Sequence, residues 1–408
     1  MKTSQTVHIV ATVKILMISD VYFPRVNGVS TSINTYRTDL LALGHECTLV
    51  TPSYPGFDAA TDDASIVRLP AMQVPRDPED RLFKFGEIER WAGRLRPEDV
   101  DVVHVQTPFA AHYAGIKIAR RLGVPVVESY HTYFEHYLQH YVPVLPAFVT
   151  RSLARRFTVS QCAQVQAIIS PSRQMADALR AYGVQTPIEV LPTGLPAYCY
   201  RAGNGARFRA AHGIGQHRPV ALFVGRVAHE KNIDFLLHML SDLRQRVPDV
   251  LLIVAGEGPA EAHLKKLATD LGLNLNILFI GYMDRQTTLL DCYRAADTFV
   301  FASRTETQGL VLIEALAQGT PVVSTAVMGT ADVMAQVSGG IVVRENVEEF
   351  ATAVARVMRD AELRAQLSAK ARIDAERWSS RSFAERLVRL YGKVVDAEPD
   401  FGTTVATP

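Results

Sequence analysis

The sequence predicts an α/β protein made of two doubly wound domains. Three observations lead to this prediction. The chain has 408 residues, which is too long for one ordinary hydrophobic core. Short, apolar and often β-branched runs alternate with helical stretches along most of it. This alternation is interrupted once, by a segment rich in Gly, Pro and Arg between Pro192 and Pro219, which is typical of a linker between domains.

The first half of the chain contains a regular series of these apolar runs. VKILMISD (13–20) is a predicted buried strand, and the segment from Gly28 to Leu43 is a predicted helix that Gly44 ends. The runs that follow are CTLVTP, SIVRLP, DVVHVQTP, VPVVESYH, AIISPS and IEVLP. Near-continuous apolar strands separated by helices indicate a parallel sheet that is covered on both faces. We assign residues 1–195 to this first domain.

The alternation begins again after Pro219. The second series of runs is PVALFVGR, VLLIVAGEG, NILFIGY, TFVFAS, TPVVST and GIVV. We assign residues 196–378 to a second Rossmann-like domain and expect the amphipathic stretch 379–395 to be a last helix that joins the first domain. Ligands of such sheets bind beyond the carboxyl ends of the strands. The pattern therefore predicts a binding site in a cleft that the two domains face.

The composition restricts the functional classes. The 43 basic and 42 acidic residues leave a formal net charge of +1, without the basic surplus that a nucleic-acid-binding protein has. Cys47, Cys162, Cys199 and Cys292 are far apart, which argues against a zinc site or a disulfide framework and is typical of a reducing compartment. No stretch approaches the roughly 20 apolar residues that cross a bilayer. We predict a cytoplasmic protein that is able to rest on a membrane.

The most informative motif runs from Ser303 to Ala315 and has the sequence SRTETQGLVLIEA. A helix is expected to begin near Gly309, where unpaired N–H groups and the helix dipole attract an anion. Glu306 precedes this helix, and Glu314 lies inside it among apolar residues, where an unpaired charge is costly. A carboxylate accepts two hydrogen bonds from a vicinal diol. The motif therefore predicts a diphosphate site whose two carboxylates bind the hydroxyl groups of a sugar and of a ribose.

A second motif, GRVAHEKN (225–232), directly follows the predicted strand PVALFV. Arg226 lies at the strand end and Lys231 at the start of the next helix, so we expect both side chains to reach the cleft. A planar guanidinium and a compact ammonium together suit a diphosphate leaving group. The alternative is a surface ion pair between Lys231 and Glu230, which the position at the strand end makes less attractive.

Two segments of the first domain follow strands in the same way. Gly28 opens the helix after the first strand, so its N–H can meet a ligand. His131 follows VPVVES within the aromatic segment SYHTYFEHYLQHY (129–141) and is expected at the rim of the cleft. His136 and His140 have the i, i+4 spacing of metal ligands, but the segment lacks the HExxH pattern and a further ligand. An apolar or sugar-stacking wall is the preferred interpretation.

Taken together, these residues resemble the retaining glycosyltransferases of family four, which have the GT-B fold. The resemblance extends from Lys14 to about Tyr391, and its most specific part is the pair Glu306 and Glu314, separated by seven residues. It implies a donor site made of Gly28, Arg226, Lys231, Tyr282, Met283, Glu306, Gln308, Gly309, Leu310, Val311 and Glu314. It implies that His131, Arg226, Lys231 and Glu306 act in catalysis.

The resemblance also implies a role for each part of this set. Arg226 and Lys231 would bind the diphosphate, together with the N–H groups of residues 308–311 and with Gly28 of the first domain. Glu306 would hold hydroxyl groups of the sugar, and Glu314 those of the ribose. The backbone near Tyr282 and Met283 would contact the base, and His131 would lie beside the transferred sugar.

No metal or cofactor is expected. Members of the family need no metal, and the basic pair Arg226 and Lys231 would replace it, so the nucleotide sugar is a substrate and the list of cofactors is empty. Asp99-Val100-Asp101 matches an acidic triplet that binds a divalent metal in some sugar transferases. Here it only leads into the strand DVVHVQ, and we interpret it as the solvated start of that strand.

Within the family, HTYFEHYLQHYVP and SRTETQGLVLIEA are similar to diacylglycerol glucosyltransferases. We predict transfer of a hexose, with retention of the anomeric configuration, from a UDP-sugar to a hydroxyl group of a membrane glycerolipid or of a small polyol or sugar. GDP-mannose is the alternative donor. A nucleotide-sugar epimerase with the same fold and a nucleotide-sugar-binding module are the alternative functions.

One segment of the first domain predicts contact with a membrane. PVLPAFVTRSLARRFTVSQCAQ (143–164) carries Arg151, Arg155 and Arg156 close to the aromatic segment 129–141. Such a combination suits an anionic bilayer, to which each basic side chain contributes about 1 kcal/mol. We therefore expect peripheral binding at the inner face of the plasma membrane. An ordinary surface helix, whose arginines pair with neighbouring acids, is the alternative.

Overall fold

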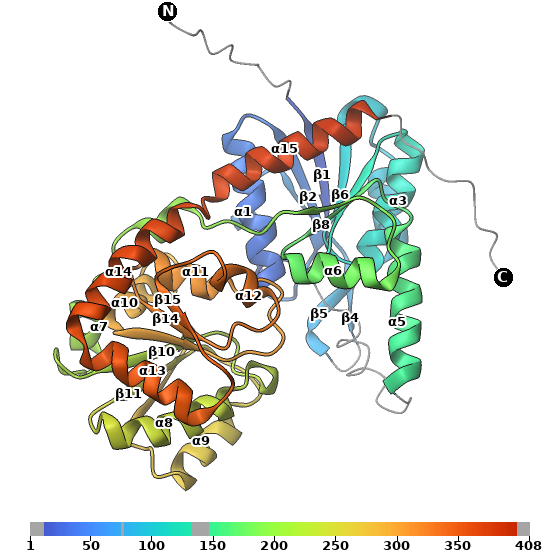
Figure 1. Ribbon diagram of the computed structural model, residues 1–408. Coiled ribbons are helices and arrows are strands. Elements are labelled where there is room, and N and C mark those ends of the chain that lie inside the picture. The colour runs from blue at the N-terminus through green and yellow to red at the C-terminus, as the bar shows by residue number, and fades with distance from the viewer. Residues whose placement is uncertain (1–11, 75–76, 132–146, 398–408) are drawn as a thin grey trace, which may run out of the picture. The chain divides into compact units, whose positions relative to one another are not determined.

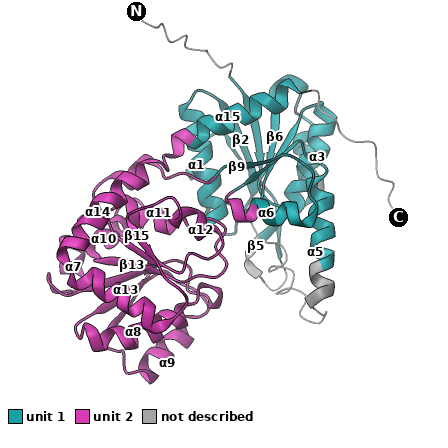
Figure 2. Ribbon diagram, in the orientation of Figure 1, with its two compact units in different colours: residues 1–170, 176–191, 383–408 teal, residues 171–175, 192–382 magenta. Residues whose placement is uncertain are grey.

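The computed structural model describes residues 12–74, 77–131 and 147–397. The chain forms two compact units (Figure 1, Figure 2). Unit 1 comprises residues 1–170, 176–191 and 383–408, and unit 2 comprises residues 171–175 and 192–382. The division predicted from the sequence lies after residue 195, with the returning helix beginning at 379. Residues 192–195 and 379–382 are grouped with unit 2.

Unit 1 contains a parallel sheet of seven strands in the order β3-β2-β1-β6-β7-β8-β9. Every residue of β6, β7 and β8 is buried, which explains why these strands appear in the sequence as continuous apolar runs. The strand order changes direction between β1 and β6, which are direct neighbours. The strands are β1 (Lys14–Ile18), β2 (Glu46–Pro52), β3 (Ile66–Leu69), β6 (Val102–Val105), β7 (Val126–Ser129), β8 (Ala167–Ser170) and β9 (Ile188–Val190).

The helices of unit 1 begin and end where local chemistry requires it. In α1 the side chain of Asn27 accepts a hydrogen bond from the N–H of Ser30, and Gly44 beyond its end has a φ of 88°. The α-helices are α1 (Gly28–Ala42), α2 (Phe85–Ala92), α3 (Ala110–Leu122), α5 (Ala147–Cys162), α6 (Arg173–Tyr182) and α15 (Ser380–Asp396), and the short 3₁₀ helices are η1 (Ala59–Thr61) and η2 (Pro97–Asp99). An antiparallel ribbon of β4 (Ala71–Val74) and β5 (Asp77–Phe83) was not expected.

A buried histidine fastens the last helix to unit 1. His104 of β6 is fully buried, and its Nδ1 lies 2.6 Å from the hydroxyl of Tyr391 in α15. Its Nε2 lies 2.9 Å from Oγ of Ser129. Burial lowers the pKa of His104 to about 3, so its ring is neutral at pH 7. The end of the chain is thus held to the middle of the sheet, and Figure 1 shows α15 lying along this unit.

Unit 2 contains a second parallel sheet, of six strands in the order β12-β11-β10-β13-β14-β15. Its strand order changes direction between the neighbours β10 and β13. The strands are β10 (Val220–Val224), β11 (Leu251–Ala255), β12 (Ile277–Gly281), β13 (Thr298–Phe301), β14 (Val322–Ser324) and β15 (Gly340–Val342). The helices are α7 (Gly205–Ala211), α8 (Ile233–Arg246), α9 (Glu261–Asp270), α10 (Thr288–Ala295), α11 (Leu310–Ala317), α12 (Gly329–Met334), α13 (Val347–Arg359) and α14 (Ala361–Glu376), with η3 (Ala197–Tyr200) and η4 (His229–Lys231).

The composition of the segment 192–219 had predicted a linker between domains. In the structure this segment folds as part of unit 2. Its glycines allow it to pack on α10: a Cβ on Gly203 would lie 2.2 Å from the carbonyl oxygen of Leu290. The buried guanidinium of Arg209 donates to the carbonyl oxygens of Ala295 and Arg218. Gly and Arg therefore serve close packing here, which their frequency alone did not reveal.

No helix among the described residues is long and apolar enough to span a membrane.

Candidate active site

The two motifs of unit 2 meet at the point where the strand order of its sheet changes direction. The segment 225–232 follows β10, and the segment 303–309 follows β13. Because these strands are parallel neighbours, the segments leave the same edge of the sheet side by side. Hydrogen bonds join them, since Nδ2 of Asn232 donates to the carbonyl oxygen of Ala302 at 3.2 Å. This edge is where a doubly wound sheet binds its ligand.

Two predicted residues are in direct contact at this edge. Nζ of Lys231 lies 2.6 Å from Oε1 of Glu306, and the two side chains are 18% and 20% exposed. Arg226 lies on the same segment as Lys231 and is exposed. Within the part of the chain that the structure describes, its guanidinium has no hydrogen-bond or ion-pair partner. This edge thus presents Lys231, which is paired with Glu306, and Arg226, which has no partner among the described residues. Such a pair of cations suits an anionic ligand.

The loop that carries Glu306 is fixed by two glycines. The carbonyl oxygen of Glu306 accepts a hydrogen bond of 2.9 Å from the N–H of Gly329 at the start of α12. A Cβ on Gly329 would lie 2.1 Å from the carbonyl oxygen of Thr307, so only glycine permits this approach. Gly309 has a φ of 88°, which glycine adopts without strain. The position of the carboxylate is therefore set by the backbone on both sides of it.

The start of α11 presents unused backbone donors. Gly309 caps this helix without a side-chain hydrogen bond. The N–H groups of residues 308–311 donate to no acceptor among the described residues. The Gln308 side chain is occupied elsewhere, because its amide exchanges two hydrogen bonds with the backbone of Thr193. Free N–H groups and the positive end of the helix dipole are features that suit this turn to an anion.

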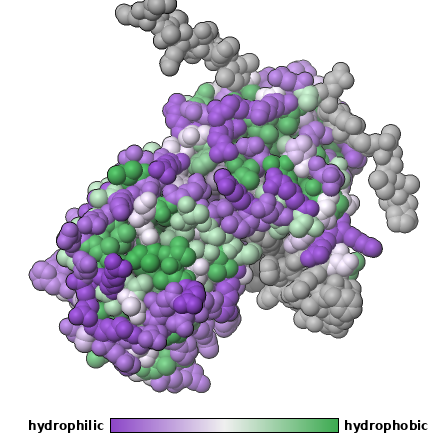
Figure 3. All heavy atoms as spheres, in the orientation of Figure 1, coloured by the Kyte–Doolittle hydropathy of each residue, from purple (hydrophilic) through white to green (hydrophobic). Residues whose placement is uncertain are grey.

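The surface around α11 is apolar. In the face drawn in Figure 3, apolar residues gather on unit 2 around the place where Figure 1 labels α11 and β15. Every residue of this helix from Leu312 to Ala317 is buried, Glu314 included. Leu310 and Val311 are half-buried beside the unused N–H groups. The helix behind the candidate anion site is therefore apolar.

Glu314 has two partners that the sequence analysis missed. Its Oε1 pairs with Nη2 of Arg285, and its Oε2 accepts a hydrogen bond of 2.8 Å from the hydroxyl of Tyr293. The carboxylate is 5% exposed. The charge of Glu314 raises the pKa of Arg285, so this guanidinium stays protonated. A carboxylate has about four acceptor positions, and two remain for a ligand. No pattern of spacing links 285, 293 and 314.

The predicted base-contacting residues follow β12. Tyr282 is 57% exposed, and its N–H donates to Oε1 of Glu257 at 3.2 Å. Met283 is half-buried. Gly256 at the end of β11 is bridged to Gly281 at the end of β12. The backbone at 282–283 is thus held at the same edge of the sheet as the diphosphate-binding candidates.

Gly28 and His131 belong to unit 1 and lie on its own sheet edge. Gly28 opens α1, and no atom lies within 4 Å of the place where its Cβ would be, so the space beside its Cα is open. His131 follows β7 and is half-buried. Burial lowers the pKa of His131 to about 4, so this ring is neutral at pH 7. The His131 ring can therefore form hydrogen bonds but carries no positive charge at pH 7.

Gln106, which the sequence analysis did not single out, is the partner of His131. Its Oε1 lies 3.1 Å from Nε2 of His131. Its Nε2 is buried and has no hydrogen-bond partner among the described residues. A buried donor without a partner is costly unless a ligand or water satisfies it. The pair therefore offers a donor on Gln106 to a hydroxyl group. Nδ1 of the neutral His131 ring, which has no partner among the described residues, offers an acceptor.

The two metal candidates of unit 1 have different outcomes. Asp99 bonds to Arg96, and Oδ2 of Asp101 accepts a hydrogen bond of 2.7 Å from the N–H of Lys14 in β1. Both carboxylates therefore accept hydrogen bonds from neighbouring backbone N–H groups near the start of β6. His136 and His140 lie outside the described residues.

Comparison with known proteins assigns both halves of the chain to glycosyltransferases. A family model described as Glycosyltransferase Family 4 matches residues 26–197, and one described as Glycosyl transferases group 1 matches residues 205–374. The alpha-monoglucosyldiacylglycerol synthase of Streptococcus pneumoniae is 33% identical over 320 residues, which are 76% of this chain and 70% of that protein. A GDP-mannose-dependent alpha-mannosyltransferase of Mycobacterium tuberculosis is 27% identical over 326 residues, covering 79% of this chain and 81% of that protein.

A solved structure agrees with this assignment at the level of the fold. The sucrose-phosphate synthase of Thermosynechococcus elongatus has a TM-score of 0.78 and 19% sequence identity, and the match covers 94% of this chain and 99% of that one. It has the same two parallel-sheet halves, which confirms the predicted fold class. The chain therefore belongs to glycosyltransferase family 4, has the GT-B fold and is an enzyme of the hexosyltransferase type.

Proposed function

We propose that this enzyme transfers a hexose from a UDP-sugar to a hydroxyl group of a membrane glycerolipid. The observation that carries the proposal is the contact between Lys231 and Glu306 at the edge of the unit 2 sheet. One group suits a diphosphate and the other suits sugar hydroxyls, and they lie at the point of the sheet where a nucleotide binds. The lipid acceptor is proposed from the name of the Streptococcus pneumoniae relative. GDP-mannose is the alternative donor.

In this proposal unit 2 binds the donor. Arg226, Lys231 and the N–H groups of residues 308–311 hold the diphosphate. Glu306 holds hydroxyl groups of the hexose, and Glu314, oriented by Arg285 and Tyr293, holds the ribose. The backbone at Tyr282 and Met283 contacts the base. From unit 1, His131 and Gln106 offer hydrogen bonds to a sugar or acceptor hydroxyl, and Gly28 offers an N–H to a donor phosphate.

The proposed transfer retains the anomeric configuration and needs no metal. The bond between the anomeric carbon and the phosphate oxygen breaks, and a bond to the acceptor oxygen forms on the same face. The leaving diphosphate accepts the proton of the acceptor hydroxyl. Arg226 and Lys231 stabilise the negative charge that grows on the diphosphate, the role that a divalent cation plays elsewhere.

A panel of donors and acceptors tests the proposed reaction. The enzyme is incubated with UDP-, GDP- and ADP-sugars, each with and without diacylglycerol vesicles. We expect a glycolipid from a UDP-hexose, and NMR of the product should show the anomeric configuration of the donor. A glycolipid formed from GDP-mannose would establish the alternative donor. Conversion of the nucleotide sugar without an acceptor would identify an epimerase, and binding without turnover would identify a binding module.

Replacement of Lys231 by Ala should slow transfer. Loss of one strong electrostatic donor to the leaving group should lower kcat by about 10²–10³. We expect little change in the melting temperature, because the ammonium is placed for a ligand and its removal opens Glu306 to water. Assays contain EDTA, which should leave the wild-type rate unchanged. Lys265→Ala removes a lysine that is also paired with a glutamate, Glu261, and is the matched control. Wild-type turnover of the Lys231 variant would contradict its role.

The two glutamates should differ in their effects on binding. Glu314→Gln should weaken UDP binding by about tenfold, since a charged acceptor of the ribose is lost. Glu306→Gln should leave UDP binding unchanged or tighter, because Lys231 no longer has a competing carboxylate, while transfer falls. Calorimetry with UDP measures the first effect and a transfer assay the second.

A variant with an intact carboxylate controls for disturbed packing around Arg285. Tyr293→Phe removes the hydroxyl that orients Glu314 and keeps its charge, so UDP binding should weaken less than in Glu314→Gln. Equal loss of UDP binding in the Glu306 and Glu314 variants would refute the division of roles.

The proposed lipid acceptor requires contact with a membrane. In α5, Arg155 and Arg156 are exposed, and the guanidinium of Arg155 lies 5.1 Å from the ring centroid of Tyr182. The side chain of Arg151 and the aromatic residues 132–141 lie outside the described residues. Peripheral binding at the inner face of the plasma membrane thus remains a proposal, supported by the two described arginines.

Vesicle flotation measures this contact. Anionic vesicles should retain the wild type at low salt, and changing Arg151, Arg155 and Arg156 together to Ser should release it. The control changes Arg344, Arg356 and Arg359 of unit 2 to Ser, which removes the same charge. If the wild type ignores anionic vesicles, or if both triple variants behave alike, a soluble sugar or polyol replaces the lipid as the proposed acceptor.

A further inference from the structure

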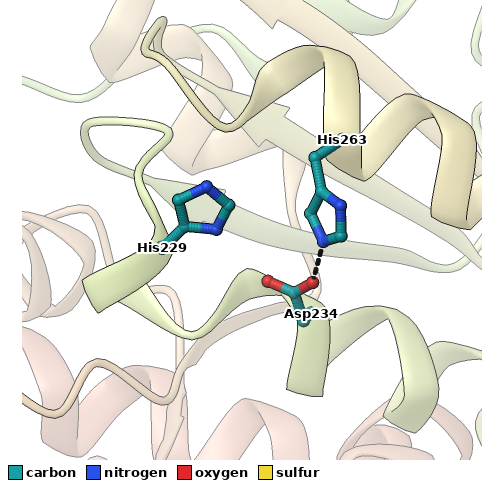
Figure 4. A group of neighbouring side chains, drawn as sticks. All are labelled: His229, Asp234 and His263. Carbon is teal, nitrogen blue, oxygen red and sulfur yellow. Dashed lines mark hydrogen bonds and ion pairs between the residues drawn. The ribbon is translucent and has the colours of Figure 1, made fainter.

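Two imidazoles and a carboxylate from three different elements of unit 2 converge beside the diphosphate-binding segment. His229 belongs to η4, Asp234 to the first turn of α8, and His263 to α9. One ligand atom from each lies within 4.8 Å of the others, the one such group of three among the described residues. Figure 4 shows Nε2 of His263 bonded to the carboxylate of Asp234, with the ring of His229 alongside.

The backbone holds these elements together independently of the three side chains. The N–H of Val227 donates to the carbonyl oxygen of Glu257 at 2.9 Å, and its carbonyl oxygen accepts from the N–H of Ala260 at 3.0 Å. A Cβ on Gly258 would lie 2.3 Å from that same carbonyl oxygen. The segment after β10 and the start of α9 are therefore in fixed contact. The fold therefore holds the backbones of η4 and α9 close together, and the side-chain rotamers bring the ligand atoms within 4.8 Å.

The chemistry of the group suits a borderline-soft divalent cation. Imidazole nitrogen and carboxylate oxygen bind Zn²⁺ at about 2.0–2.2 Å, and three protein ligands leave one position for water. The side chains of His263 and Asp234 are 50% and 34% exposed, and His229 is exposed, so small rotations can bring the ligand atoms closer. The ring centroids of His229 and His263 are 5.4 Å apart. A surface ion pair alone would involve only Asp234 and His263.

We propose that His229, Asp234 and His263 bind a zinc-class divalent ion that fastens η4 to α8 and α9. His229 lies three residues after Arg226 and two before Lys231 in the sequence. The ion therefore binds next to the diphosphate-binding cations and is not one of the groups that hold the diphosphate. Because backbone hydrogen bonds hold the segment of both cations without the ion, the effect of the ion is on the stability of unit 2 and not on the rate of transfer. This site is separate from the metal-free transfer proposed above.

Zinc binding to the whole chain tests this site. Protein treated with EDTA and freed of the chelator is titrated with Zn²⁺ in competition with a chromophoric chelator. We expect one strong site per chain, and at least tenfold weaker binding in His229→Gln and in His263→Gln, because each removes one of three ligands. His217→Gln is the matched control, since His217 is an exposed histidine of unit 2 outside the group. All four cysteines are buried and offer no competing thiolates at the surface.

Thermal unfolding gives a second readout. Zn²⁺ should raise the melting temperature of the wild type and of the His217 variant by several degrees, because a ligand of the folded state stabilises it. The rise should be absent in His263→Gln, whose exposed position leaves the fold intact. Mg²⁺ should have no effect, since hard cations prefer oxygen ligands.

Two results would overturn the site. One is the absence of a stoichiometric zinc ion in the wild type, and the other is equal zinc affinity in His263→Gln and His217→Gln, which would indicate adventitious binding. Neither depends on transfer. Conversely, activity that EDTA abolishes and Mg²⁺ restores would contradict metal-free transfer and leave the zinc measurement unaffected.

Discussion

The adjacency of β10 and β13 is the constraint on which the proposed donor-binding arrangement depends. These strands are distant in sequence, and they are neighbours because the strand order of the unit 2 sheet changes direction there. The two segments that follow them therefore leave the same edge, and Lys231 reaches Glu306. Helix α12 adds a third support through the hydrogen bond from Gly329 to Glu306. The arrangement results from strand order, glycine contacts and backbone hydrogen bonds.

Local placement of charge replaces net charge in this protein. With a formal net charge of +1, the chain as a whole has no preference for anions. Arg226 and Lys231 supply two cations at one sheet edge, and the start of α11 adds unpaired N–H groups that carry only partial charge. The helix behind these groups is apolar, so the attraction is less screened than at a wet surface. A nearly neutral protein can bind a diphosphate in this way.

Much of the fold could be predicted because each central strand is a continuous apolar run, and the helix starts at Gly28 and Gly309 have local signals. Because both motifs directly follow predicted strands, residues of 225–232 and 303–309 were expected at one cleft, but the order of the strands came only from the structure. Contacts that depend on loop conformation had no such signal. Arg285, in an irregular loop, and Tyr293, in α10, both contact Glu314. Gln106 follows β6 and contacts His131, which follows the neighbouring strand β7. The Gly-rich composition of 192–219 indicated a linker, whereas Gly203 and Gly205 allow close packing on α10.

The two glutamates of the SRTETQGLVLIEA motif differ in how freely they can exchange partners. Glu306 is paired with a single lysine, and both side chains are about one-fifth exposed, so a ligand can reach the pair. A diphosphate that binds Lys231 in place of Glu306 would release the carboxylate for hydroxyl groups at the same moment. Glu314 is buried with a guanidinium and a phenol, and breaking that group would leave a charge without a partner. One carboxylate is thus exchangeable and the other fixed, a difference that suits a group at the reacting sugar and a group at the unreactive ribose.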